Sequence, residues 1–354
     1  MFRFCFAWNR RKVYRVLGVV PVFLTLGLFG WSLFEYLGTV VPLIHDRSAS
    51  LAFFWGVLAV VTALLALWSY GVCVARDPGS PALREPVVYS HGGSSSSAPF
   101  IRIGTGNGTP QQGGSDSDSE QTGVSRRRYA DAYDDSSDDE LALTSEQRRQ
   151  TELIHTITTK DNGEPRFCLK CNVAKPDRAH HCSVCGVCVL KMDHHCPWLN
   201  NCVGFRTQKA FLLFIVYSAV YTILISTTSF MYYLVHILNA PMNMDVSLST
   251  LAMMLMAAAF ALCLLGFCGF HAYLVLSNLS TIESYESNNY RVPGTMRAVK
   301  PKNINLFDLG WRKNLTLVFG PKWKHWFVPT NTTPGDGVSF AISFDSYNEL
   351  QHTG

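Results

Sequence analysis

Four long apolar blocks limit the folds that are open to this chain. They span roughly residues 13–37, 51–75, 209–238 and 248–276, and none of them contains a run of charged residues. About 20 consecutive apolar residues are enough to cross the hydrocarbon core of a bilayer as a helix. The alternative, four buried helices of a soluble protein, would require an unusually large core. The sequence therefore predicts an α-helical polytopic membrane protein with four transmembrane helices.

The basic residues predict how these helices are oriented. Lysine and arginine are frequent before the first block, after the second block and after the fourth, whereas the two short loops on the other side contain only Arg47 among basic residues. Loops rich in lysine and arginine stay on the cytosolic side. We therefore expect both termini, and the long segment between helices 2 and 3, to face the cytosol from an endomembrane such as that of the Golgi, endosome or vacuole.

Composition divides the remainder of the chain. Residues 1–12 are a short basic and aromatic cytosolic N-terminus. Residues 80–159 are rich in glycine and serine and then acidic, with too little apolar surface to fold, so we expect a disordered cytosolic insert. Residues 166–211 form a cysteine-rich domain. Residues 277–354 form a cytosolic C-terminal tail, whose aromatic residues beside lysines suggest packing at the membrane interface.

The cysteine-rich domain has the composition of a metal-binding module. Seven of the chain's 11 cysteines lie there together with four histidines. In a reducing cytosol, clustered cysteines are metal ligands more often than disulfides. Two structural Zn²⁺ sites need eight ligands, and eleven candidates are present. The spacing alone does not show which ligand joins which ion. The candidates are Cys168, Cys171, Cys182, Cys185, Cys188, Cys196, Cys202, His180, His181, His194 and His195.

The surplus over eight ligands includes the run Asp193-His194-His195-Cys196. A thiol beside a histidine and an acid supplies the groups needed for nucleophilic catalysis, because a neighbouring base generates the thiolate. This run is therefore a candidate catalytic site.

The order of these residues resembles the DHHC family of protein S-acyltransferases (palmitoyltransferases). Asp77-Pro78-Gly79 resembles that family's Asp-Pro-Gly motif, and Ser280-Thr281-Ile282-Glu283 resembles its Thr-Thr-x-Glu motif, with serine in the first position. The spacing and the tail look most similar to fungal members. The motifs that carry the resemblance are Cys168-x2-Cys171, Pro176-x-Arg178, His181-Cys182, Cys185, Cys188, the run from Asp193 to Trp198, and Cys202.

The resemblance implies a two-zinc domain and a two-step acyl transfer. Cys196 would be the nucleophile, His194 the base and Asp193 the residue that orients His194. An acyl group, palmitoyl in the first instance, would pass from acyl-CoA to Cys196 and then to a cysteine of a target protein. One zinc ion would be held by Cys168, Cys171, His181 and Cys188, and the other by Cys182, Cys185, His195 and Cys202.

The four helices are expected to enclose the acyl chain. Trp198 and Phe211 are candidates for the mouth of the cavity. Tyr221 lies about thirteen residues into the third helix, roughly 20 Å at ~1.5 Å per residue, and Ser32 lies at a similar or greater depth in the first. We expect these two residues to close the cavity, although ordinary helix packing would account for them equally well.

The expected partners are long-chain acyl-CoA, membrane lipid and membrane-associated proteins with cytosolic cysteines; no nucleic acid is expected. Two other functions remain open: a non-catalytic membrane adaptor with a zinc module, and a RING-like ubiquitin ligase, whose ligands are more widely spaced. Four basic residues are candidates for contacts with the CoA phosphates, or else ordinary solvated charges. They are Lys175, Arg178, Lys191 and Arg206.

Overall fold

The structure is a computed structural model that describes residues 17–81, 156–239, 247–286, 289–291, 298–299 and 304–353. These residues belong to a single unit of the chain. The predicted N-terminal segment 1–12 and most of the predicted insert, residues 82–155, lie outside the described residues.

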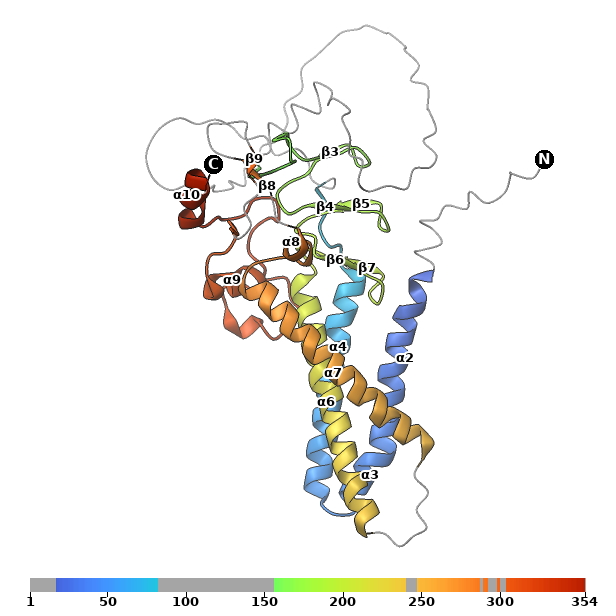
Figure 1. The fold of residues 1–354 in the computed structure, drawn as a ribbon. Coiled ribbons are helices and arrows are strands. Elements are labelled where there is room, and N and C mark those ends of the chain that lie inside the picture. Colours follow the sequence, from blue (N-terminus) through green and yellow to red (C-terminus); the bar gives the residue numbers. More distant parts are fainter. Residues whose placement is uncertain are drawn as a thin grey trace, which may run out of the picture. The chain divides into compact units, whose positions relative to one another are not determined.

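Four helices in the described part of the chain are long and apolar enough to cross a membrane (Figure 1). The first runs from Val19 to His45 as α2 (Val19–Glu35), a π-helical turn η1 (Tyr36–Val40) and α3 (Val41–His45). It continues beyond the predicted end at residue 37, because the residues that follow remain apolar and Pro42 lies in the first turn of α3, where proline is tolerated. The others are α4 (Ala49–Ala75), α6 (Gln208–Asn239) and α7 (Leu248–Leu276).

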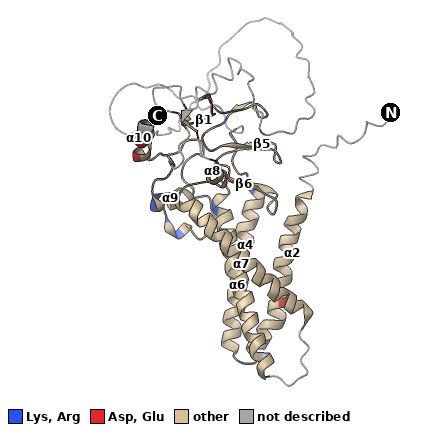
Figure 2. Ribbon diagram, in the orientation of Figure 1, with Lys and Arg blue, Asp and Glu red and all other residues tan. Residues whose placement is uncertain are grey.

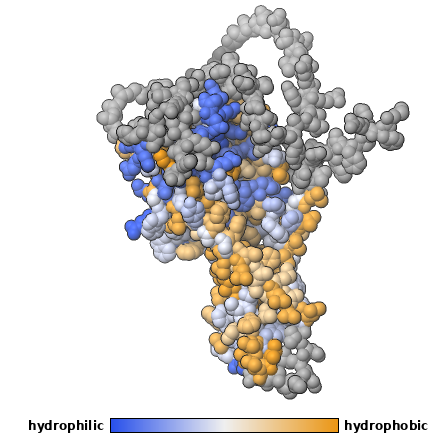
Figure 3. Space-filling view, viewed as in Figure 1, coloured by the Kyte–Doolittle hydropathy of each residue, from blue (hydrophilic) through white to orange (hydrophobic). Residues whose placement is uncertain are grey.

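α6 is the central helix of the bundle. It packs against both α4 and α7. Of the residues in its most apolar stretch, 61% are buried, compared with 11% in the first span. The outward faces of the helices carry exposed leucine, phenylalanine and valine side chains, which colour the bundle orange in Figure 3. Exposed apolar faces on long helices fit contact with lipid rather than with water.

Three short antiparallel hairpins lie in the chain between α4 and α6. The first pairs β2 (Phe167–Cys168) with β3 (Val173–Ala174). The second pairs β4 (His180–Cys182) with β5 (Val187–Val189), and the third pairs β6 (His194–Cys196) with β7 (Asn201–Val203). Because these strands have only two or three residues each, hydrogen bonding within them cannot account for the stability of the module.

The Asp77-Pro78-Gly79 turn attaches the end of α4 to these hairpins. The carboxylate of Asp77 accepts a hydrogen bond from the Gly79 amide at 2.6 Å, and Gly79 adopts a φ of 100° that favours glycine. Two backbone carbonyls of the turn bind the hairpin region. The Gly79 carbonyl accepts a hydrogen bond from the Leu190 amide at 2.9 Å, and the Pro78 carbonyl accepts one from the Arg206 amide at 3.2 Å.

The C-terminal region folds back onto the bundle and the hairpins. α8 (Thr281–Tyr285) follows α7, and β8 (Asn289–Arg291) pairs with β9 (Ala298–Val299) and with β1 (Thr158–Thr159). The strand β1 corrects the prediction that the insert extends to residue 159, because Thr158 and Thr159 are buried beside Tyr290. Their pairing partner is far away in the sequence, so composition gave no sign of it.

The remaining elements are α9 (Trp311–Phe319), the 3₁₀ turn η3 (Trp323–His325) and α10 (Phe344–Thr353). The side chain of Asn314 donates to the carbonyl of Leu276 at 2.7 Å, which fastens α9 to the end of α7. Trp311, Trp323 and Phe327 are exposed beside basic residues, which is typical of a membrane interface. Figure 2 shows blue segments around α9 and mostly tan helices.

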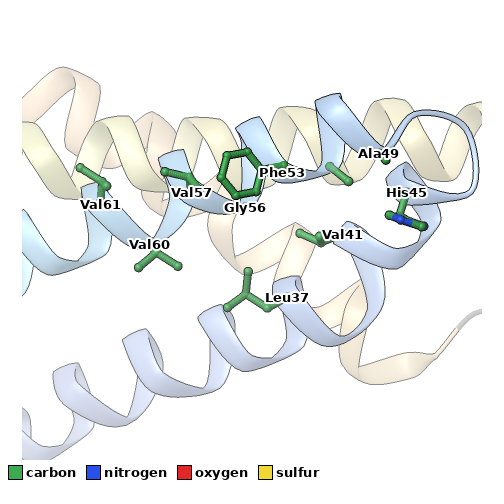
Figure 4. A pocket seen from close by; sticks show the side chains of 10 residues that line it. Leu37, Val41, His45, Ala49, Phe53, Gly56, Val57, Val60 and Val61 are labelled. Atoms are coloured by element: carbon green, nitrogen blue, oxygen red, sulfur yellow. The ribbon is translucent and has the colours of Figure 1, made fainter.

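A cavity of about 600 Å³ lies between the first span and α4 (Figure 4). Leu37, Val41, Phe53 and Val57 contribute to its apolar lining, and His45 lies at one end. Neither Cys196 nor Tyr221 lines it. It is therefore a groove on the lipid-facing side of the bundle rather than the site of the chemistry described below.

Candidate active site and metal centres

The three hairpins are copies of one pattern that recurs every fourteen residues. Cys168, Cys182 and Cys196 each end the first strand of a hairpin, and each is paired with the residue five positions later. A residue with positive φ follows each turn, at Asn172, Gly186 and Asn200. The ligand spacing did not predict this repeat, although an alignment of the chain with itself would show it.

The repeat builds two sets of four ligands from neighbouring hairpins. The turn of one hairpin supplies two cysteines, and the next hairpin supplies a histidine and a cysteine that face each other in register, His181 with Cys188 and His195 with Cys202. Within each set the four ligand atoms lie within 4.8 Å of one another. The sets are Cys168, Cys171, His181 and Cys188, and Cys182, Cys185, His195 and Cys202.

These distances fit a metal ion better than a set of ordinary hydrogen bonds. The Nδ1 atom of His195 lies 3.6, 3.4 and 3.6 Å from the sulfur atoms of Cys182, Cys185 and Cys202. Three thiolates and one imidazole are typical ligands of a four-coordinate structural zinc site. Both clusters can therefore hold a metal ion, and no ligand position is left open for water.

The third hairpin has the same turn but lacks the second cysteine. Leu199 stands where Cys171 and Cys185 stand in the first two copies, and its amide donates to the carbonyl of Cys196. Cys196 therefore occupies a ligand position of the pattern in a hairpin that cannot complete a third metal set. This explains in structural terms why its thiol is free while the six other cysteines of the domain belong to clusters.

The alternation of side chains along β6 places the metal ligand His195 on one face of the strand and the candidate catalytic residues His194 and Cys196 on the other. Successive residues of a strand point to opposite faces. His195 points into the second metal cluster, so His194 and Cys196 share the other face. That face meets the membrane helices: Cys196 is buried in a cluster with Tyr70 and Cys73 of α4 and Phe211 of α6.

Asp193 holds the ring of His194 from one side. The carboxylate Oδ2 lies 2.6 Å from the imidazole Nδ1, which leaves the other nitrogen, Nε2, for proton transfer. Burial alone lowers the pKa of His194, but its interactions with Asp193 and Cys196 outweigh burial and raise the pKa to about 9. Phe211 packs against the same ring with 5.2 Å between ring centroids.

Thr281 holds Asp193 in turn. Its hydroxyl donates to Oδ2 at 2.7 Å and its amide donates to Oδ1 at 2.8 Å. Burial raises the pKa of Asp193, but the hydrogen bonds from His194 and Thr281 more than compensate and bring it below its ordinary value. The carboxylate is thus fixed in its charged form.

A buried ion pair fixes α8 against the hairpins. The Nη2 atom of Arg178 lies 2.7 Å from Oε2 of Glu283, and its Nε atom donates to Oε1 at 2.9 Å. Ser280 and Glu283 also form a reciprocal capping box at the start of α8. Arg178, Ser280 and Glu283 therefore place Thr281 at Asp193 without touching the reacting groups.

These contacts correct the expectation for two of the four basic residues. Arg178 is 2% exposed and bound to Glu283, and Lys191 is 5% exposed. Burial, reinforced by nearby Arg178, lowers the pKa of Lys191 to about 7. Neither side chain is placed to bind CoA phosphates at the surface. Arg206 is half-exposed, and its Nη1 atom lies 3.8 Å from Asp77.

The residues expected to line the acyl cavity fall into two groups, one near Cys196 and one deeper in the bundle. Phe211 is buried beside His194, whereas Trp198 is half-exposed and its carbonyl accepts a hydrogen bond from the Tyr70 hydroxyl at 2.7 Å. Deeper in the bundle, the hydroxyl oxygens of Ser32 and Tyr221 lie 2.9 Å apart. The structure thus joins two residues that are 189 positions apart in the sequence.

Comparison with known proteins bears on this arrangement. A family model described as DHHC palmitoyltransferase matches residues 161–288, a range that covers the three hairpins, α6, α7 and α8. This part of the chain is thus similar to the DHHC palmitoyltransferase domain.

Proteins similar to this chain have names that agree with the DHHC domain. "Palmitoyltransferase ZDHHC15" of Rattus norvegicus is 40% identical over 199 residues, which is 56% of this chain and 56% of that protein. "Palmitoyltransferase ZDHHC2" of Homo sapiens is 40% identical over 193 residues, 54% of this chain and 50% of that protein. The chain thus spans about half the length of the curated relatives that it matches.

Proposed function

We propose that this protein is a membrane-embedded protein S-acyltransferase that uses Cys196 as its nucleophile. The observation that carries the proposal is the separation of groups along β6. His195 belongs to a metal cluster, while His194 and Cys196 face the membrane helices, with Asp193 fixing the histidine. The substrates would be a long-chain acyl-CoA, with palmitoyl-CoA as the first choice, and cytosolic cysteines of membrane-associated proteins.

The reaction proceeds in two transfers. The Cys196 sulfur attacks the thioester carbon of acyl-CoA, a new carbon–sulfur bond forms, and the bond to CoA breaks. His194 takes the proton of the Cys196 thiol, and CoA leaves as a thiol by taking that proton from His194. In the second transfer a target thiol gives its proton to His194, attacks the acyl group and displaces Cys196. Asp193 keeps His194 in the orientation that both transfers need.

The metal clusters would each hold a zinc ion with a purely structural role. A closed site with four protein ligands supplies folding energy and has no open position for substrate. His195 on the second cluster would fix β6, so that Cys196 and His194 keep their positions on the opposite face. The three-sulfur, one-nitrogen donor sets fit this assignment.

The acyl chain would extend from Cys196 into the bundle, and Ser32 and Tyr221 would close its path. Each methylene removed from water contributes roughly 0.8 kcal/mol, so burial of the chain favours binding. The contact between the two hydroxyls supports this role, because it joins α2 and α6 at Tyr221, about thirteen residues into α6, and a rise of ~1.5 Å per residue makes that roughly the length of a sixteen-carbon chain. Trp198 and Phe211 would contact the chain near the thioester.

The distribution of basic residues supports a cytosolic active site with both termini on the same side. The hairpins lie next to the Asp77-Pro78-Gly79 end of α4 and the start of α6, which is the predicted cytosolic end of both spans. Acyl-CoA and target cysteines would reach this end from the cytosol of an endomembrane such as the Golgi, endosome or vacuole.

Labelling with palmitoyl-CoA tests the proposal. The purified full chain in detergent is incubated with labelled palmitoyl-CoA, and hydroxylamine-sensitive label is measured. Wild type is expected to be labelled, and Cys196→Ser is expected to carry no hydroxylamine-sensitive label. Cys263→Ser is the matched control, since Cys263 is exposed on α7 and belongs to neither metal cluster.

Zinc content separates loss of the nucleophile from loss of the fold. Cys196→Ser is expected to retain the zinc content of wild type, because Cys196 belongs to neither cluster. Equal labelling of Cys196→Ser and wild type would refute the assignment of the nucleophile. A wild-type protein that binds zinc but is never labelled would instead favour the non-catalytic adaptor.

A further inference from the structure

Glu35 is an acidic residue within the first membrane-spanning segment. A carboxyl group at such a position is costly, and it usually has a functional role and a specific partner. Glu35 directly precedes the π-helical turn η1, and such turns are frequent at functional sites. Neither the metal clusters nor the transfer reaction uses this residue.

Thr250 on α7 is the partner of Glu35 on another helix, whereas Thr39 contacts the carboxylate from within the first span. The Thr250 hydroxyl donates to the carboxylate Oε1 at 2.5 Å, and Thr250 is only 1% exposed. One turn earlier, the indole of Trp31 donates to Ser249 at 3.3 Å. These two bonds connect α2 to the start of α7, which meets the first span there (Figure 1).

A second bond at the same depth connects the first span to α6. The hydroxyls of Tyr36 and Thr228 lie 3.0 Å apart, and both residues are buried. Tyr36 follows Ser32 by one helical turn, so this layer lies about 5.4 Å further along the first span than the Ser32–Tyr221 contact. The bundle thus has two polar layers in series below the active site, and Glu35 belongs to the deeper one.

We propose that Glu35 and Thr250 form a second stop in the acyl path and limit the longest chain that the enzyme accepts. A chain that passes Ser32 and Tyr221 must next separate α2 from α7. That separation breaks the Glu35–Thr250 bond and leaves the half-buried carboxylate oxygen with only the longer contact to Thr39, at 3.4 Å, which is unfavourable in an apolar environment. The inference rests on the proposed acyltransferase function and adds a residue that sets specificity within it.

The test is made where the first stop has been removed. Tyr221→Ala, Tyr221→Ala/Glu35→Ala and Tyr221→Ala/Thr250→Val are each incubated with C16 and C20 acyl-CoA, and the acyl groups on Cys196 are identified by mass spectrometry. Both double variants are expected to show a C20-to-C16 ratio about tenfold above that of Tyr221→Ala, since pockets discriminate added methylenes by at least this factor.

Two matched variants make the result specific to the hydrogen bond. Tyr221→Ala/Glu35→Gln keeps an oxygen acceptor for Thr250 and is expected to behave like Tyr221→Ala. Tyr221→Ala/Thr227→Val removes an exposed hydroxyl of α6 that bonds only to its own helix, and it should also leave the ratio unchanged.

The outcomes distinguish this inference from the function on which it rests. If Cys196 is acylated by C16 acyl-CoA in all variants but Glu35→Ala and Thr250→Val leave the ratio unchanged, the second stop is overturned while the enzyme assignment stands. An absence of acyl-Cys196 in wild type would instead overturn the proposed function. A raised ratio in the Glu35→Gln variant as well would show that the Glu35–Thr250 bond is not what limits the chain.

Discussion

The hydroxyl and the amide of Thr281 donate hydrogen bonds to the two carboxylate oxygens of Asp193, although the residues are 88 positions apart in the sequence. One lies in the cysteine-rich domain and the other follows the fourth membrane span. The contact makes the orientation of His194 depend on α8, and α8 in turn depends on the buried Arg178–Glu283 pair.

Removal of the Thr281 hydroxyl should slow acylation without displacing metal. Thr281→Val loses the side-chain hydrogen bond to Asp193, and bonds to charged groups contribute about 1.5–3 kcal/mol. We expect the rate of acyl-Cys196 formation to fall by roughly 10- to 100-fold, with unchanged zinc content. Ser284→Ala, which removes an exposed hydroxyl from the same short helix, is the control. Equal rates for the two variants would contradict the orienting role.

The Arg178–Glu283 pair should make the stability of the fold depend on pH in the acidic range. Burial raises the pKa of Glu283, but Arg178 together with the Ser280 amide and Lys191 outweighs burial and brings the pKa below its ordinary value. A lowered folded-state pKa gives stability that is present above the unfolded value, about 4.3, and is lost as pH falls through the folded value. Glu283→Gln should therefore unfold at a lower temperature than wild type at pH 7. The difference between the two unfolding temperatures should narrow below about pH 4.

Thermal unfolding in detergent across pH 3–7 measures this gap. Breaking a buried pair by removing one partner costs about 3–5 kcal/mol, so the difference at pH 7 should be large. The exposed Glu286→Gln is the matched control and should follow wild type throughout. A gap that stays constant down to pH 3 would rule out the ionised pair as its source.

Gly204 should not tolerate a side chain. A Cβ atom there would lie 2.5 Å from Cγ1 of Val189 and 3.2 Å from the carbonyl of Pro78, where the Asp77-Pro78-Gly79 turn meets the hairpins. Gly204→Ala is therefore expected to lower the unfolding temperature and the yield of folded protein. Gly266→Ala, which meets nothing within 4 Å, is expected to have little effect. Comparable melting curves for the two variants would contradict the close packing.

Metal removal should unfold the hairpins first. The strands have only two or three residues each, and the small buried cluster between the second and third hairpins includes the ligands Cys182 and Cys202. Structural zinc sites contribute about 10–16 kcal/mol in small metal-dependent folds. We expect purified protein to contain about two zinc ions per chain, and a chelator to release both with loss of acylation and a lower unfolding temperature. Cys171→Ser should reduce the zinc content, whereas Cys263→Ser should keep it. Full acylation by metal-free protein would show that the clusters are dispensable.

Much of the candidate site could be predicted because its signals are local. Cysteine and histidine spacing identified a metal module with a surplus thiol, and the resemblance implied ligand groupings that match the two spatial clusters. The exposure of the basic residues could not be predicted in the same way. Arg178 and Lys191 look like surface charges in the sequence, and only the tertiary structure buries them, Arg178 against Glu283 of α8.

The sequence by itself determined the four spans and the metal-binding module. Apolar length decides which segments enter a membrane, and the clustered cysteines and histidines supply more ligands than two metal sites need. Only the tertiary structure decided what surrounds Cys196 and what lies below it. The Ser32–Tyr221 and Glu35–Thr250 contacts join residues on different spans, and Thr281–Asp193 joins α8 to the cysteine-rich domain. Such pairs depend on how helices pack and rotate against one another, which no local pattern encodes.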